Sequence, residues 1–143
     1  MEKTNSVLIV DDEPANIRVL SHILGADYRL YAVNNGTDAI EAAKNHAPDI
    51  VLLDVIMPGM DGYDVISALK ASDETKDIPV IFITGLGNAT EEEKGLALGA
   101  ADYISKPFSP TIVKHRVLKQ IEVINMRREL AAARLALAEN KKG

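Results

Sequence analysis

The sequence contains no cysteine and no tryptophan, and only 4% of its residues are aromatic. Without cysteine, the chain cannot form a disulfide, a zinc-thiolate site or a thiol nucleophile. No apolar run reaches the ~18 residues of a membrane-spanning helix, and the polar N-terminus lacks a signal-peptide core. A net charge of −5 argues against nucleic acid or an anionic membrane as a direct partner. We therefore expect a cytoplasmic protein that contacts neither.

The remaining composition is typical of one globular domain, with 143 residues of which 47% are hydrophobic and 26% charged. Short apolar runs rich in β-branched residues recur along the chain. Because polar residues do not alternate within them, these runs predict strands buried on both faces, as in a parallel sheet. The five predicted strands cover residues 7–10, 28–33, 50–53, 78–83 and 101–105.

Apolar residues at helical spacing separate these strands, and helix-capping residues stand at the segment ends. Gly25 suits the end of the first helix, Thr37 or Asn35 can cap the second, and Asp61 can cap the third. Alternating strands and helices predict an α/β fold, a five-stranded parallel doubly wound (flavodoxin-like) sheet with five helices.

The last helix is unusually long, because nothing from Thr111 to Asn140 breaks a helical pattern. A continuous helix of ~30 residues would extend ~45 Å, too far to lie wholly on so small a domain. We predict a globular domain over residues 1–125 and a helical extension over 126–143, acting as a linker or joining two copies. Its apolar residues follow the 3, 4, 3, 4 spacing of a short heptad pattern: Val123, Met126, Leu130, Ala133 and Leu137.

Polar side chains follow four of the five predicted strands. Asp11 and Asp12 come after the first, Asp54 after the third, Thr84 after the fourth and Lys106 after the fifth. In a doubly wound sheet, ligands bind outside the carboxyl ends of the strands. We therefore expect three carboxylates, one hydroxyl and one amine to meet at one edge of the sheet.

Three neighbouring carboxylates repel one another unless a cation lies among them. Oxygen ligands without histidine or cysteine suit a hard ion, and Mg²⁺ is the best match. The group then has the parts for phosphoryl transfer onto a carboxylate. Asp54 is the candidate nucleophile, Lys106 the cationic partner and Thr84 the hydroxyl donor for a phosphoryl oxygen.

Four motifs together carry a family resemblance. They are Val-Asp-Asp-Glu at 10–13, Leu-Asp-Val-Ile-Met-Pro-Gly-Met-Asp-Gly at 53–62, Ile-Thr-Gly at 83–85 and Tyr-Ile-Ser-Lys-Pro-Phe at 103–108. In this order and at this spacing, the sequence resembles the receiver domain of two-component response regulators over about residues 6–125. Each motif alone is weak, whereas the set is specific.

The resemblance implies that Asp54 accepts a phosphoryl group from a sensor histidine kinase. Asp11 and Asp12 would bind Mg²⁺, with Asp12 and Asp54 as direct ligands and Asp11 acting largely through water. The backbone carbonyl of Ile56 would supply another oxygen. Lys106 would pair with Asp54 or its phosphate.

The resemblance also implies a conformational switch. Thr84 would move to hydrogen-bond the phosphoryl group, and Tyr103 would rotate inward with it. The changed surface would be read by a downstream effector protein or domain. The bond between Lys106 and Pro107 is expected to be cis. Taken alone, Tyr103 would be interpreted as a half-buried strand aromatic.

Two alternative functions remain open from the sequence. An aspartate-nucleophile phosphatase of the haloacid-dehalogenase type needs a second Asp two residues after the nucleophile, and Ile56 occupies that position. A receiver-like scaffold would work by protein contacts without phosphate. We expect a module that phosphorylates and dephosphorylates itself without external turnover, and slowly loses its phosphate because Ile56 cannot position water through its side chain. Gly85-Leu86-Gly87 lacks the phosphate-loop pattern and is interpreted as a flexible connection.

Overall fold

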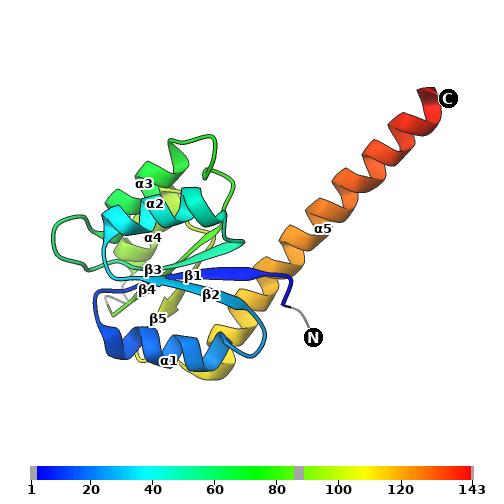
Figure 1. Ribbon diagram of the computed structural model, residues 1–143. Helices are drawn as coiled ribbons and strands as arrows, with labels where there is room; N and C mark the ends of the chain where they lie inside the picture. The colour runs from blue at the N-terminus through cyan, green and yellow to red at the C-terminus, as the bar shows by residue number, and fades with distance from the viewer. Residues whose placement is uncertain (1–2, 86–88, 143) are drawn as a thin grey trace.

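A five-stranded parallel sheet lies between two layers of helices in the computed structural model, which describes residues 3–85 and 89–142 (Figure 1). The strand order is β2-β1-β3-β4-β5, so the predicted doubly wound α/β fold is confirmed. In chain order the elements are β1 (Ser6–Val10), α1 (Pro14–Leu24), β2 (Arg29–Val33), α2 (Gly36–His46), β3 (Ile50–Asp54), α3 (Gly62–Lys70), β4 (Val80–Thr84), α4 (Ala89–Ala97), β5 (Asp102–Ser105) and α5 (Pro110–Lys142).

The three central strands β1, β3 and β4 are buried along their whole length. Successive strand residues point to opposite faces, so each strand contributes to two separate cores. On one face, Leu53 and Phe82 belong to the core shared with α2 and α3. On the other face, Leu52 and Ile83 belong to the core shared with α1 and the first half of α5. Burial on both faces explains why these strands read as continuous apolar runs.

Local capping places the helix starts. The side chain of Asn35 accepts a hydrogen bond from the backbone N–H of Asp38 at 2.8 Å, so Asn35 caps α2, and Thr37 lies inside that helix. Asp61 caps α3 as predicted, through a capping box with Asp64. Gly25 follows α1 with φ of −65°, an ordinary helical value rather than a left-handed stop.

Helix α4 is thinly packed on the domain. Gly95 is its one buried residue within the described part of the chain, and a Cβ there would collide with the hydroxyl of Tyr103. The helix begins at Ala89 and carries Glu91 and Glu92 in its first turn. The predicted flexible connection Gly85-Leu86-Gly87 lies outside the described residues except for Gly85.

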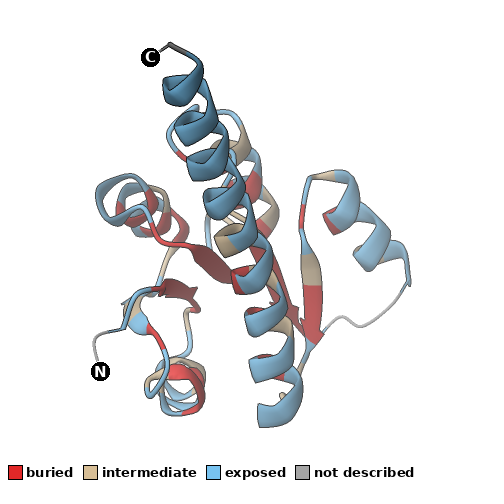
Figure 2. Ribbon diagram, turned by 90° about the vertical axis from the view of Figure 1, so that its right-hand side faces the viewer, coloured by how far each residue is buried: buried red, intermediate tan, exposed pale blue. Residues whose placement is uncertain are grey.

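Helix α5 runs unbroken from the domain into solvent (Figures 1 and 2). Val113, Val117 and Ile121 are buried against the sheet. Farther along, Ile124 packs partly buried against the same core, and Arg128 pairs with Asp49. None of the helices in the described ranges is apolar enough over sufficient length to cross a membrane.

Candidate functional site

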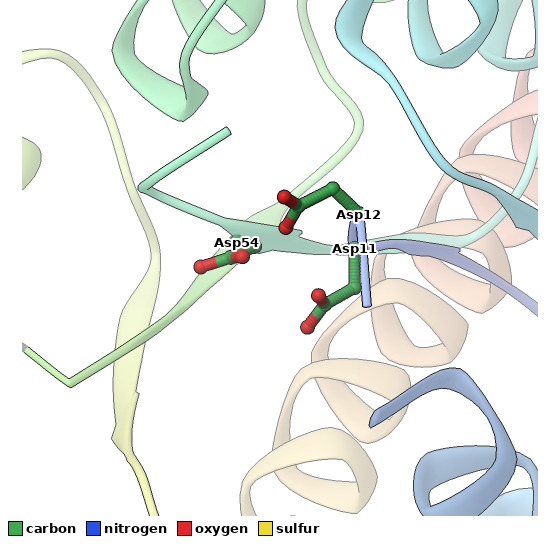
Figure 3. A group of neighbouring side chains, drawn as sticks. All are labelled: Asp11, Asp12 and Asp54. Carbon is green, nitrogen blue, oxygen red and sulfur yellow. The ribbon is translucent and has the colours of Figure 1, made fainter. Parts of the chain in front are cut away.

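Three aspartates meet at the carboxyl edge of the sheet (Figure 3). Asp11 and Asp12 follow β1, and Asp54 is the last residue of β3, which pairs with β1. One carboxylate oxygen from each lies within 4.8 Å of the others. Asp11 and Asp54 are buried, and Asp12 is partly exposed. The adjacency of β1 and β3 therefore brings together residues more than forty positions apart, at the edge that the sequence predicted.

The carboxylate of Asp54 is held by few donors for a buried group. The backbone N–H of Ile56 donates to it at 3.4 Å, and Nζ of Lys106 lies 3.3 Å from the same oxygen. Burial and then the neighbouring charge of Asp11 raise the pKa of Asp54 to about 6, and Lys106 and the Ile56 N–H offset part of this. The site therefore holds a carboxylate whose charged form is only partly stabilised by the protein.

Asp11 provides a direct test of whether a cation fits. Its Oδ1 accepts a hydrogen bond from the backbone N–H of Glu13 at 2.9 Å. Its Oδ2 is buried, has no hydrogen-bond partner, and lies 3.6 Å from Nζ of Lys106. An unsatisfied buried carboxylate oxygen is costly. Because the atoms that the three aspartates offer to a metal ion are all carboxylate oxygens, the arrangement suits a hard divalent cation.

Lys106 and Thr84 complete the predicted group. Lys106 contacts both Asp11 and Asp54, so one ammonium group faces two buried carboxylates. Its backbone N–H donates to the carbonyl of Thr84 at 2.9 Å, which ties the segment after β5 to the end of β4. The bond between Lys106 and Pro107 is cis, as the family resemblance implies. Thr84 is buried at the carboxyl end of β4, and all five predicted residues lie at one edge.

Tyr103 already lies inward in this structure, with 8% of its surface exposed. Its hydroxyl donates to the backbone carbonyl of Glu91 in α4, and its ring centroid is 5.6 Å from that of Phe82. The missing side chain of Gly95 leaves room for the hydroxyl. The interpretation of Tyr103 as half-buried was therefore wrong, because α4 covers the ring.

The chain is similar to known proteins in sequence. The family model described as response regulator receiver domain matches residues 7–118. The chain belongs to the response regulator receiver domain family. A Vibrio cholerae protein named probable cyclic di-GMP phosphodiesterase is 46% identical over 112 residues, which are 78% of this chain but 25% of that protein. This receiver thus spans about a quarter of the length of that curated relative.

Solved receiver structures superpose closely on this one. A putative response regulator from Chloroflexus aurantiacus has a TM-score of 0.79 and 31% identity, covering 84% of this chain and 99% of its own. The receiver domain of a Pseudomonas aeruginosa sensor histidine kinase, described with magnesium in its active-site cleft, has a TM-score of 0.77 and 28% identity, covering 82% and 98%. The receiver is thus a phosphoacceptor signalling module of two-component systems.

Sequence reasoning missed the aromatic contacts between α3 and α4. The hydroxyl of Tyr63 donates to the carboxylate of Glu91, and Nζ of Lys94 lies 4.2 Å from the centre of the Tyr63 ring. Both contacts join residues about thirty positions apart. No local spacing signals them, because they depend on how α4 lies over the sheet.

Proposed function

We propose that Asp54 is the phosphoacceptor of this receiver and takes its phosphoryl group from the phosphohistidine of a sensor histidine kinase. The observation that carries this is the buried position of Asp54 between Asp11 and Lys106 at the end of β3. A carboxylate oxygen of Asp54 attacks phosphorus, the bond from phosphorus to the histidine nitrogen breaks, and an acyl phosphate forms. With a pKa of about 6, Asp54 is mostly ionised at neutral pH and able to attack.

We infer that Asp11, Asp12 and Asp54, together with the backbone carbonyl of Ile56, hold Mg²⁺. Support comes from the unpaired Oδ2 of Asp11 and from the oxygen-only composition of the cluster. The magnesium described for the similar Pseudomonas aeruginosa receiver agrees with this inference. When bound, Mg²⁺ neutralises the negative charge that the carboxylates and phosphoryl oxygens bring together.

The remaining residues act on the phosphoryl group or report it. Lys106 already faces the two buried carboxylates and is placed to pair with a phosphoryl oxygen near Asp54. Thr84 would donate its hydroxyl to another phosphoryl oxygen. To reach the phosphoryl group, Thr84 would have to move. We propose that the movement of Thr84 is transmitted to Tyr103 and α4, because the Tyr103 hydroxyl is hydrogen-bonded to the backbone carbonyl of Glu91. The surface formed by α4, β5 and α5 would then change for a partner.

The proposed chemistry is limited to the chain itself, with self-phosphorylation and self-dephosphorylation but no external turnover. A phosphatase of the haloacid-dehalogenase type would need an acid two residues after Asp54. Ile56 occupies that position with an exposed side chain that carries no proton donor. The same side chain cannot orient an attacking water, which supports a slow loss of phosphate.

We propose that residues 1–125 form the receiver and that residues 126–143 form a helical extension toward an effector or a second copy. The chain spans a quarter of the Vibrio cholerae relative, whose named activity concerns cyclic di-GMP. We propose that the effector controlled by this receiver acts on cyclic di-GMP, as the name of that relative suggests. The cytoplasmic location stays a prediction from the sequence.

Incubation with Mg²⁺ and acetyl phosphate, followed by intact-mass measurement, tests the phosphoacceptor. We expect a single phosphoryl adduct in the unaltered chain and none in Asp54→Asn. The matched control is Asp49→Asn, which changes the buried aspartate immediately before the same strand and should keep the adduct. An adduct that survives Asp54→Asn would contradict the assignment. No adduct in the unaltered chain would favour a scaffold that works without phosphate.

A further inference from the structure

An apolar stripe runs from Val123 onward along the side of α5 that faces away from the domain. Val123, Met126, Leu130 and Leu137 are exposed side chains on this stripe. Val123, Met126 and Leu130, together with Arg127, line a shallow apolar hollow on the helix surface. Figure 2 shows the outer turns of the helix exposed, with no other element covering them. Contiguous exposed apolar surface of this kind marks a contact site.

The spacing of the stripe says what kind of surface covers it. The apolar residues recur at alternating intervals of three and four, with Ala133 filling the place between Leu130 and Leu137. A repeat of 3.5 residues keeps one seam facing a partner only when that partner is another helix. The occupant is therefore a helix that lies alongside α5.

Charged residues beside the stripe select the partner. Glu122 and Glu129 lie along one flank, and Arg127 and Arg134 lie along the other, each arginine five residues after a glutamate. In a parallel in-register pair of helices, a residue on the first flank meets the residue five positions later on the partner helix. Glu122 then faces Arg127 of the second copy, and Glu129 faces Arg134, twice over by symmetry.

An antiparallel pair would bring the same flanks together. Glutamate would then face glutamate and arginine would face arginine, which opposes association. Within residues 3–85 and 89–142, no ion pair is formed by Glu122, Arg127, Glu129 or Arg134. These four charges are thus available to a partner, and their arrangement fits a parallel copy of the same helix.

The domain leaves this seam open. Ile121 packs against the sheet and Arg128 pairs with Asp49, and both lie on the side of α5 opposite the stripe. Each domain would therefore sit on the outside of the helix pair, without blocking the seam. Upstream of Val123, the corresponding seam positions carry Lys119, which is exposed and charged, and Arg116, which pairs with Asp102 of its own domain. The pairing accordingly starts at Val123.

We propose that α5 is a homodimerisation helix, and that residues from Val123 onward pair with a second copy as a parallel, in-register two-stranded coiled coil. The seam from Val123 to Leu137 spans about two heptads and includes an alanine, so the association is weak and reversible. It needs no phosphoryl group, because all of its contacts are made by α5 from Glu122 onward. The proposed dimer therefore does not depend on whether Asp54 is phosphorylated.

The absence of cysteine permits a direct test by site-specific crosslinking of the full chain. Under mild oxidation, we expect Leu130→Cys and Leu137→Cys each to form disulfide-linked dimers. Leu135→Cys is the matched control, because Leu135 is equally an exposed leucine of this helix but lies away from the stripe. Crosslinking at only one of the two stripe positions indicates an antiparallel pair. That result, or equal crosslinking at Leu135, would overturn the proposal.

Charge exchange tests the direction of the pair in solution. In sedimentation of the full chain over a concentration series, Glu129→Arg should weaken dimerisation several-fold, because it places arginine opposite Arg134 of the partner. The double variant with Glu129→Arg and Arg134→Glu should regain the dimer, because it again places opposite charges across the seam. Leu130→Ser should weaken it by about tenfold or more, and Leu135→Ser should not. A chain that stays monomeric at every concentration, or a double exchange that fails to rescue, would refute the parallel pairing.

Discussion

Strand β3 is bounded by two buried aspartates that the protein treats differently. Asp49 immediately precedes the strand and Asp54 ends it. Asp49 accepts hydrogen bonds from the backbone N–H of Ser6 at 2.8 Å and from the side chain of Asn5 at 3.3 Å, and it pairs with Arg128. Its charge is well supported, and it serves to join β1, β3 and α5.

The carboxylate of Asp54 receives fewer hydrogen bonds than that of Asp49, and it lies beside the negative charge of Asp11. One long hydrogen bond from Ile56 and an ion pair with Lys106 face the charge of Asp11, and burial raises the pKa of Asp54 to about 6. The comparison indicates how a carboxylate is kept reactive. Where the fold supplies all the donors, the carboxylate is structural, and where it withholds them, the proposed cation and phosphoryl group would complete the site.

The largest expected effect concerns the stability of the metal-free protein as pH changes. The folded-state pKa of Asp54, about 6, lies above its ordinary value of 3.8. The folded state therefore holds a proton that the unfolded state releases first, and stability falls as pH rises from about 4 to about 6. At pH 7 with a chelator, Asp54→Asn should be more stable than the unaltered chain by up to about 3 kcal/mol, with little difference at pH 4.

Urea unfolding at several pH values measures this difference. Addition of Mg²⁺ at pH 7 should narrow the gap by stabilising the unaltered chain more than Asp54→Asn. Parallel stability profiles for the two proteins across this pH range would mean that Asp54 is not destabilised by its surroundings.

Replacing Asp49, which immediately precedes β3, should destabilise the protein, whereas replacing Asp54 should stabilise it. Asp49→Ala removes the acceptor for Ser6, Asn5 and Arg128 and should lower the free energy of unfolding by about 2 kcal/mol. Asp73→Ala is the control, because Asp73 is almost fully exposed, and its ion pair with Lys76 lies on the surface. Its loss should cost less than about 0.5 kcal/mol. Equal effects in urea unfolding would remove the distinction between the two ends of β3.

A smaller effect is expected when only the cation partner of Asp49 is removed. Arg128→Ala leaves the two hydrogen bonds from Ser6 and Asn5 in place, and the Arg128 side chain is 58% exposed. We expect a loss of about 0.5 kcal/mol, because solvent screens the pair. Lys114→Ala, a change to an exposed cation of the same helix that lies off the stripe, should be neutral in the same unfolding measurement. A loss as large as that of Asp49→Ala would assign the anchoring to the ion pair alone.

The smallest effect on stability is expected at Ile56, whose exposed side chain lies two residues after the proposed phosphoacceptor Asp54. Ile56→Asn supplies a hydrogen-bonding group that can orient water, so the acyl phosphate should decay several-fold faster with unfolding unchanged. Following phosphoryl loss by intact mass after removal of the donor measures this. Unchanged or slower decay would show that Ile56 does not set the phosphate lifetime.

Sequence patterns predicted the strands and the five site residues because both depend on local rules. Continuous apolar runs mark strands buried on both faces, and polar residues at strand ends must share an edge in a parallel sheet. Taken alone, Tyr103 was interpreted as half-buried, and its full burial was not predicted because it depends on α4 and on the space left at Gly95. The sequence offered Thr37 and Asn35 as caps of α2, and only the structure identified Asn35, because its side chain accepts a hydrogen bond from the backbone N–H of Asp38.

The sequence by itself determined the family, the order of the elements, the five residues at the carboxyl edge and the apolar stripe on the last helix. Each follows from spacing along the chain, which sets which residues share a strand end or a helix face. Only the tertiary structure decided which buried aspartate is satisfied and which is left short of donors. That difference arises because Asn5, Ser6 and Arg128 converge on Asp49, whereas Asp54 faces Asp11 and a single lysine.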